Sequence, residues 1–241
     1  YSEKLQEIIE NVSSTTDLEE VGTYTAEREV KKVLFIVVTS NKGLAGAFNS
    51  SVIKELNLAI SNTKHEVEIL SVGKKVYEAI RKNRTVYDNQ SAIFDSMSFE
   101  AVSNFMEHVM KDYREGKFAK VFVIYNKFIN AATQEVKTEQ VLPIKMAEKT
   151  AGANTDYIFE PNAKEILDVL IPKSIKTQVY KSVLDSIASE HGARMTAMHK
   201  ATDNAQALKN DLVIFYNKAR QAAITNEILE IVGGAEALKN S

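Results

Sequence analysis

The sequence contains no cysteine, and this absence excludes several kinds of chemistry. A chain without thiols has no disulfide framework, no thiolate metal ligands and no cysteine nucleophile. A histidine metal site is not expected either, because only His191 and His199 share a predicted element and they stand eight residues apart, about 12 Å along a helix. Neither a Gly-x-Ser-x-Gly nor a His-Glu-x-x-His motif occurs. We therefore expect no catalytic site, no metal and no cofactor.

An excess of charge of one sign is also missing. The 30 Lys and Arg against 32 Asp and Glu leave a formal net charge of -2. Nucleic-acid-binding proteins normally display a basic face, so nucleic acid is not an expected partner. No apolar run is long enough to span a bilayer, and the first residues do not have the pattern of a signal peptide. Any association with a membrane is therefore expected to go through a partner, without direct insertion.

Proline is scarce, with only three in the chain, and none follows Pro172. Gly192 is the single interior helix breaker before Gly233 and Gly234. The run from Lys173 to Val232 therefore predicts one helix of roughly 90 Å. A helix of that length is several times the mean for globular proteins and is too long to be covered by one small domain.

A series of residues in this helix, apolar or small except for His191 and Arg194, follows spacings of four and three. They are Ile187, His191, Arg194, Met198, Ala201, Ala205, Leu208, Leu212, Phe215, Ala219 and Ala222. This period of 3.5 is typical of a left-handed coiled coil, so a partner helix is expected along it. After Ala222 the phase slips, and Ile224, Ile228, Ile231, Ala235 and Leu238 continue on a rotated face. Two faces indicate two environments; the alternative is a long helix that lies on its own domain.

The segment before this helix alternates strands with helices. Wholly apolar, β-branched runs at Val33–Val38 and Val121–Tyr125, with a further run at Val67–Val72, predict buried strands. Gln134–Leu142 predicts an additional strand near an edge. Between them, Ser98 is expected to cap a helix that ends at Gly116. The expected fold is α/β, a Rossmann-like domain with a mostly parallel sheet flanked by helices.

The turn Thr39–Asn49 follows the first strand and contains Gly43 and Gly46. Glycine-rich turns between a strand and a helix can cradle phosphate. This turn matches neither the three-glycine dinucleotide fingerprint nor the phosphate loop that ends in Gly-Lys-Ser/Thr. A tight turn that needs glycine for close packing and a nucleotide site therefore both stay open.

Three stretches of the long helix carry a family resemblance. Ser189–Met198, Tyr216–Thr225 and Glu227–Ala235 closely resemble the gamma subunits of F-type (F1Fo) ATP synthases, and the last motif is highly specific. Thr39–Asn49 and Asp156–Pro161 are also similar to segments of that family, so the resemblance covers essentially the whole chain. The cysteine-bearing insertion of chloroplast relatives is absent, which favours a bacterial source.

The resemblance implies a central rotor shaft without catalytic activity. In that family an antiparallel coiled coil of N- and C-terminal helices passes through a hexamer of alpha and beta subunits, and an α/β domain forms its foot. Rotation couples proton translocation through the membrane c-ring to ATP synthesis or hydrolysis in the hexamer. The expected partners are therefore the alpha, beta and epsilon subunits and the c-ring, at the cytoplasmic face of the bacterial inner membrane as a peripheral protein.

The resemblance also assigns site residues, all of them to partner binding. Arg220 has a planar, permanently charged guanidinium that suits carboxylates, and it lies at the phase slip. Arg220, Gln221 and Thr225 would contact a loop of the beta subunit. Ile224, Ile228 and Ile231 would turn in an apolar bearing, and Tyr157 and Glu160 would lie near the membrane ring and the epsilon subunit.

The expected organisation has four parts. They are 1–12, the remnant of an N-terminal coiled-coil helix; 13–29, a connector; 30–161, the α/β domain; and 162–241, the long C-terminal helix. Because family members begin with a long helix and only Tyr1–Val12 corresponds to it, we expect the sequence to lack most of that helix. Two other functions stay open: a nucleotide-binding α/β enzyme with a helical dimerisation arm, and a coiled-coil adaptor that forms a homodimer.

Overall fold

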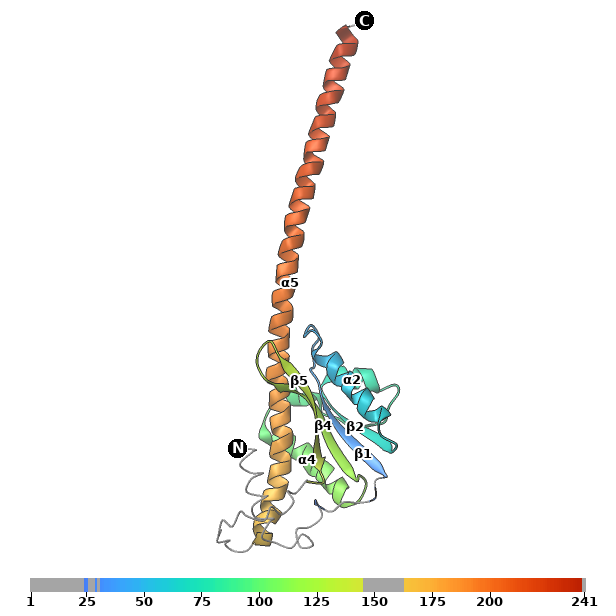
Figure 1. The fold of residues 1–241 in the computed structure, drawn as a ribbon, viewed down its shortest axis with the longest axis vertical. Coiled ribbons are helices and arrows are strands. Elements are labelled where there is room, and N and C mark those ends of the chain that lie inside the picture. The colour runs from blue at the N-terminus through green and yellow to red at the C-terminus, as the bar shows by residue number, and fades with distance from the viewer. Residues whose placement is uncertain (1–23, 26–28, 30, 145–162, 240–241) are drawn as a thin grey trace. The chain divides into compact units, whose positions relative to one another are not determined.

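A computed structural model describes residues 24–25, 29, 31–144 and 163–239 of the chain (Figure 1). The elements are β1 (Lys32–Val38), α2 (Phe48–Ser61), β2 (Glu66–Val72), α3 (Lys74–Ile80), β3 (Val86–Asn89), the 3₁₀ turn η2 (Ser91–Asp95), α4 (Phe99–Arg114), β4 (Lys120–Phe128), β5 (Gln134–Leu142) and α5 (Ala163–Lys239). The chain divides after Thr196 into two compact units, so that α5 contributes to both.

The first unit is built on one five-stranded sheet with the order β3-β2-β1-β4-β5. The first four of these strands run parallel, and β5 pairs antiparallel with β4 at the edge. The predicted mostly parallel sheet and the predicted edge strand at Gln134–Leu142 are both confirmed. Strand β3 was not predicted, because its four residues Val86–Asn89 contain no apolar run.

Helices cover both faces of the sheet. Helices α2 and α3 pack on one face, where Phe35, Val52 and Val76 belong to one buried cluster. Helix α4 and the first part of α5 pack on the other, as Figure 1 shows. Strand β1 lies at the centre and is buried over six consecutive residues, which explains its unbroken apolar sequence.

The ends of α4 follow the expected local chemistry. Ser98 adopts an extended backbone and its Oγ accepts a hydrogen bond from the amide of Ala101 at 3.1 Å. Gly116 follows the helix with a φ of 83°, a left-handed conformation that glycine adopts without steric penalty. Both predicted caps are confirmed.

Helix α5 spans 77 residues, more than the predicted Lys173–Val232, and it continues through Pro172. Proline removes a backbone donor and usually ends or kinks a helix. Here Leu167 and Ile171 on one side of it and Ile175 on the other are all buried in the core, so packing holds the helix on both sides. The expected start at Asn162 lies outside the described residues.

In the first unit, α5 lies on its own domain. A buried residue recurs every four positions, at Leu167, Ile171, Ile175, Val179 and Val183. Ile187, the first position of the expected coiled-coil seam, is half-buried against the same core. The alternative of a helix covered by its own domain therefore holds for this part of α5.

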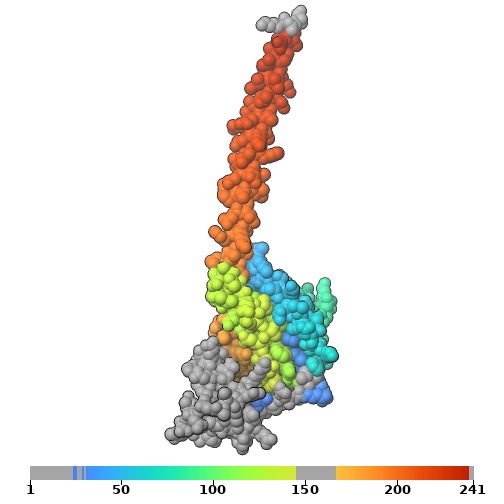
Figure 2. Space-filling model, viewed as in Figure 1, coloured from blue at the N-terminus to red at the C-terminus, as the bar shows by residue number. Residues whose placement is uncertain are grey.

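In the second unit, every described side chain from Met198 to Leu238 is exposed. Figure 2 shows this segment in orange to red. It carries large apolar residues, namely Leu208, Leu212, Val213, Ile214, Phe215, Ile224, Ile228, Leu229, Ile231, Val232 and Leu238. Contiguous apolar surface of this kind marks an interaction site. Among the described residues, no helix is long and apolar enough to cross a membrane.

Candidate partner-binding surface

Arg220 lies on the exposed part of α5 with its charge unneutralised by its own helix. Helical neighbours three and four residues away are the ones that can pair with it, and these are Tyr216, Asn217, Ala223 and Ile224, none of which is acidic. No described residue forms an ion pair or hydrogen bond with the guanidinium. Because this group is always charged and has five donors in a planar fork, it is available to a carboxylate of another chain.

Gln221 and Thr225 lie on the same exposed stretch, one turn apart. The Oγ1 of Thr225 donates to the carbonyl oxygen of Gln221 at 2.8 Å, which fixes the hydroxyl on its own helix. The side-chain amide of Gln221 has no hydrogen bond to any described residue. The pair therefore presents an amide that can both donate and accept, beside a hydroxyl in a set orientation.

Ile224, Ile228 and Ile231 form an apolar stripe next to these polar groups. Their exposed fractions are 46, 54 and 72%. Covering an isoleucine side chain contributes roughly 1.5–3 kcal/mol, so the uncovered stripe represents a large stabilisation that the described residues do not supply. Helix geometry places Ile224 about 120° around the helix from Leu212, so the two apolar faces point in different directions.

Tyr157 and Glu160, the other two residues of the predicted site, lie outside the described residues. The six remaining site residues are within eleven positions of one another on one helix. These six residues lie together because they are close in sequence, and their assignment to a beta-subunit loop and a bearing stays a prediction.

Groups of the turn after β1 accept hydrogen bonds from amides that a bound phosphate would need, which argues against the nucleotide hypothesis. The first amides of α3 are all engaged: Lys74 N donates to Asn41 Oδ1 at 2.9 Å, Lys75 N to Ser40 O at 3.1 Å, and Val76 N to Thr39 Oγ1 at 3.1 Å. A phosphate site at a helix N-terminus needs these donors free.

The other side of the turn is closed in the same way. Asn49 Oδ1 accepts from the amide of Ser40 at 3.0 Å, and the amide of Phe48 donates to Ala45 O at 3.1 Å. The amide of Phe48, the first residue of α2, is therefore occupied, and the side chain of Asn49 ties α2 to the turn.

The glycines of this turn have different roles from those expected. Gly46 has a φ of 55°, so it is needed for its backbone conformation. Gly43 faces open space, and the expectation that close packing requires it is wrong. The close approach is made by Gly73, where a Cβ would lie 2.1 Å from the carbonyl oxygen of Thr39. Sequence analysis missed Gly73, although its position between β2 and α3 was the available signal.

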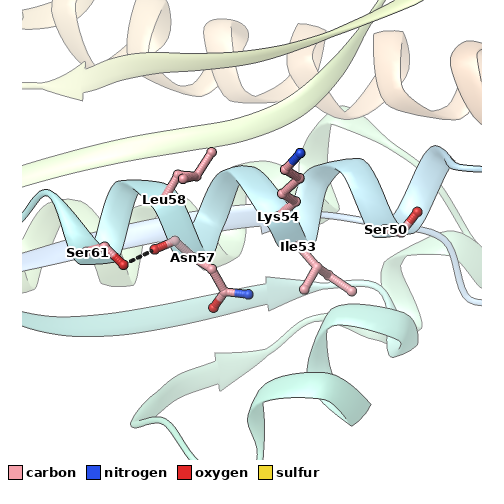
Figure 3. A pocket seen from close by; sticks show the side chains of 6 residues that line it. All are labelled: Ser50, Ile53, Lys54, Asn57, Leu58 and Ser61. Carbon is pink, nitrogen blue, oxygen red and sulfur yellow. Dashed lines mark hydrogen bonds between the residues drawn. The ribbon is translucent and has the colours of Figure 1, made fainter.

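A groove along the surface of α2 does not have the character of a catalytic cleft. It has a volume of about 450 Å³ and lies along α2, lined by Ser50, Ile53, Lys54, Asn57, Leu58 and Ser61 (Figure 3). Lys54 is the sole titratable group among these lining residues. Nor do the described residues contain a group of three His, Asp or Glu that could hold a metal ion.

The perturbed titratable groups belong to packing contacts. Burial and a 2.8 Å hydrogen bond to Asp112 raise the pKa of Tyr87, and burial and a 2.8 Å hydrogen bond to Glu139 raise the pKa of Tyr125. Burial also raises the pKa of Asp185. These groups make contacts between β-strands and helices or between neighbouring strands, and they do not line the groove along α2, so they indicate structure rather than proton transfer.

The whole chain matches a known family. A sequence profile described as "ATP synthase" matches residues 1–238. The chain is 54% identical over 240 residues to the "ATP synthase gamma chain" of Flavobacterium johnsoniae and 53% identical over 241 residues to that of Flavobacterium psychrophilum, in each case covering 99% of this chain and 84% of the relative. A Geobacter protein of the same description is 38% identical over 243 residues.

Solved structures share the fold. A chain of the Euglena gracilis mitochondrial ATP synthase in an OSCP/F1/c-ring assembly, rotational state 3, matches with a TM-score of 0.67 at 19% identity and covers 98% of this chain and 91% of that one. A chain from the central stalk/c-ring of the Tetrahymena thermophila mitochondrial ATP synthase matches with a TM-score of 0.57 at 22% identity, covering 83% and 94%. Together with the uncovered helix and its motif around Arg220, these matches show that the chain belongs to the ATP synthase gamma chain family.

Proposed function

We propose that this chain is the non-catalytic central rotor shaft of an F-type ATP synthase. The observation that carries the proposal is the second unit, a helix whose apolar residues are all exposed and which therefore needs surrounding subunits. Its family is that of the gamma chains, and the groove along α2 has Lys54 as its sole titratable lining group. We place the chain as a peripheral subunit at the cytoplasmic face of a bacterial inner membrane.

The shaft works by being asymmetric. As it turns inside a hexamer of alpha and beta subunits, its two apolar faces and its charged group meet the surrounding subunits in turn. Because the interactions differ between faces, each catalytic site would pass through states of different affinity, which links rotation to ATP synthesis or hydrolysis. The epsilon subunit and the membrane c-ring would engage the foot and deliver the rotation that proton translocation drives.

The residue roles follow from chemistry. Arg220 would pair with a carboxylate in a beta-subunit loop, supported by Gln221 and Thr225. The stripe of Ile224, Ile228 and Ile231 would turn in an apolar sleeve, where non-directional contacts resist rotation little. Tyr157 and Glu160 would lie toward the c-ring and the epsilon subunit.

The division of the chain is part of the same proposal. Residues 1–12 would pair with α5 as an N-terminal helix, 13–29 would connect it to the sheet, 30–161 would form the foot, and 162–241 the shaft. The exposed seam at Leu208, Leu212 and Phe215 supports a second helix there.

Arg220→Ala in the assembled complex tests this function. We expect co-purification with alpha and beta subunits to persist, while the binding of the shaft weakens about tenfold and ATP-driven proton pumping falls, because a charge-assisted contact is lost. Lys218→Ala removes another exposed cation two residues away and is expected to change neither. Failure of the wild-type chain to co-purify with these subunits would reject the proposed function.

A further inference from the structure

The residues of α5 that face β4 and β5 change character along the helix. Through Val183 they include the buried apolar residues described above. Beyond this point they are small or hydroxylated: Ser186 and Ser189 are buried, Gly192 is buried, and Thr196 is half-buried. An apolar contact has no preferred direction, whereas hydrogen bonds and close backbone contacts do. The contact that α5 makes through Ser186–Thr196 is thus suited to fixing the helix in one orientation.

Two hydroxyls of α5 lie within hydrogen-bond distance of backbone carbonyls of the β4–β5 hairpin, and that of Thr196 shares its single hydrogen between the hairpin and its own helix. Ser189 Oγ donates to the carbonyl oxygen of Asn126 in β4 at 3.0 Å, in a fully buried position. Thr196 Oγ1 lies 3.3 Å from the carbonyl oxygen of Ala131, in the connection between the strands, and 3.1 Å from that of Gly192 on its own helix. Both contacts join unlike elements at positions more than sixty residues apart in the chain.

Gly192 lies between these hydroxyls and permits the hairpin to approach. A Cβ at this position would lie 2.9 Å from the carbonyl oxygen of Ala131 and 3.1 Å from its Cα. These are backbone atoms, which cannot move aside as a flexible side chain would. Glycine within a helix is destabilising relative to alanine, so the contact explains the presence of a glycine here.

The hairpin connection is held in shape by its own hydrogen bonds. Asn130 Oδ1 accepts from the amides of Ala132 at 3.0 Å and Thr133 at 2.8 Å. Gln134 Nε2 donates to the carbonyl oxygen of Ala131 at 3.0 Å. The carbonyl of Ala131, which meets Thr196, is therefore oriented by hydrogen bonds within the hairpin itself.

We propose that the connection Asn130–Thr133 is a latch that fixes the rotational and axial position of α5 on the foot, with Ser189, Gly192 and Thr196 as positioning residues. Thr196 is the last residue of the first unit. The latch therefore sets the point at which torque passes between foot and shaft. This role in torque rests on the proposed rotor function; the latch as a structural device does not.

Paired threonine variants of the full chain isolate the hairpin bond. Thr196 and Thr202 both bond the carbonyl four residues earlier, and Thr202 Oγ1 does so at 2.9 Å to Met198 without a hairpin contact. We expect Thr196→Val to accelerate amide hydrogen exchange in residues 189–196 about fivefold, the factor that corresponds to one net hydrogen bond. Thr202→Val is expected to leave these amides unchanged, and Thr196→Ser to restore protection. Equal exchange in the two valine variants would overturn the latch.

Paired glycine variants test whether the close approach of Ala131 requires a glycine at position 192. Gly233 faces open space, so Gly233→Ala is expected to raise the melting temperature of the second unit's helix slightly or leave it unchanged. Gly192→Ala places the same methyl group against Ala131, and we expect a lower melting temperature of the first unit and faster exchange in the hairpin. A rise in melting temperature for Gly192→Ala would show that the approach is not required.

The torque role is tested in the assembled complex. For Thr196→Val we expect fewer protons pumped per ATP hydrolysed, with hydrolysis retained, and an unchanged ratio for Thr202→Val. If exchange accelerates but the pumping ratio is that of the wild type, the latch holds the fold and does not transmit torque. If the wild-type chain does not assemble with alpha and beta subunits, the proposed function fails while the exchange result stands.

Discussion

Helix α5 has two parts that share one secondary structure and differ in what covers them. From Leu167 to Val183 its buried apolar residues recur every four positions, whereas Leu208, Leu212 and Phe215 are separated by four and three. A strict spacing of four turns by about 40° per step around the helix, while alternating four and three stays on one face. The first pattern suits a twisted sheet and the second a straight partner helix.

The comparison teaches that helical structure by itself says little about stability. In the packed part, the helix is held by burial against the strands and α4. In the exposed part, the same kinds of side chain contribute to no described contact, and their burial becomes available on assembly. Substitutions should therefore act on the fold in the first part and on partner binding in the second.

The largest contrast is expected between two glycines. Gly73 has a φ of 112° and a Cβ there would lie 2.1 Å from Thr39 O, whereas Gly234 faces open space. We expect Gly73→Ala to destabilise the first unit by at least ~3 kcal/mol, because a strained backbone and a backbone clash add. Gly234→Ala is expected to be neutral or stabilising by up to about 1 kcal/mol. Chemical denaturation measures both, and similar values would refute the distinction.

A pair of isoleucines gives the next contrast. Ile175 is 1% exposed in the core and Ile231 is 72% exposed. Truncation of a buried isoleucine removes its transfer free energy and leaves a cavity, so Ile175→Ala is expected to lower the free energy of unfolding by about 2–4 kcal/mol. Ile231→Ala should change it by less than ~0.5 kcal/mol in the chain alone. A cost for Ile231→Ala as large as that for Ile175→Ala would mean that the second part is covered within this chain.

The smallest contrast concerns pH. Burial raises the pKa of Asp185 above its ordinary 3.8, and Glu139 raises it further, while Lys181 and Lys127 oppose this. The folded chain therefore holds this proton more tightly than the unfolded chain, and the associated stability is present below pH 3.8 and is lost as pH rises through the folded pKa.

Asp185→Asn removes this titration. We expect a gain in stability at pH 7 of well under ~1 kcal/mol, since the group is partly solvated, and a flatter profile above pH 4. Asp211→Asn, on the exposed part, is the matched control and should leave the profile as it is. If Asp185→Asn instead lowers the free energy of unfolding at pH 7, the charged form of Asp185 is the stabilising one.

Much of the fold follows from local patterns. The buried runs at Val33–Val38 and Val121–Tyr125 predict central strands because alternation disappears where both faces are covered. Ser98 and Gly116 mark the ends of α4 by their own chemistry. Strand β3 could not be predicted in this way, because it exists by pairing with β2 rather than through its own composition.

Some functional features could likewise be predicted from local sequence patterns, and others could not. The polar cluster at Arg220 and the isoleucine stripe are visible in the sequence, since both are features of one continuous helix. Gly73 and Gly192 are needed for contacts with Thr39 and Ala131, which are distant in sequence. The residues adjacent to a glycine in sequence do not indicate whether a backbone segment from a distant part of the chain packs against it.

The sequence by itself determined that a long helix ends this chain, that its apolar residues have a 3.5-residue period, and that its motifs are those of gamma chains, because these properties depend on neighbours within a few turns. The tertiary structure alone decided that the foot covers the helix as far as Thr196, that Pro172 is accommodated, and where glycine is obligatory. Spacing shows that a helical face must be covered, but which surface covers it depends on contacts between distant residues.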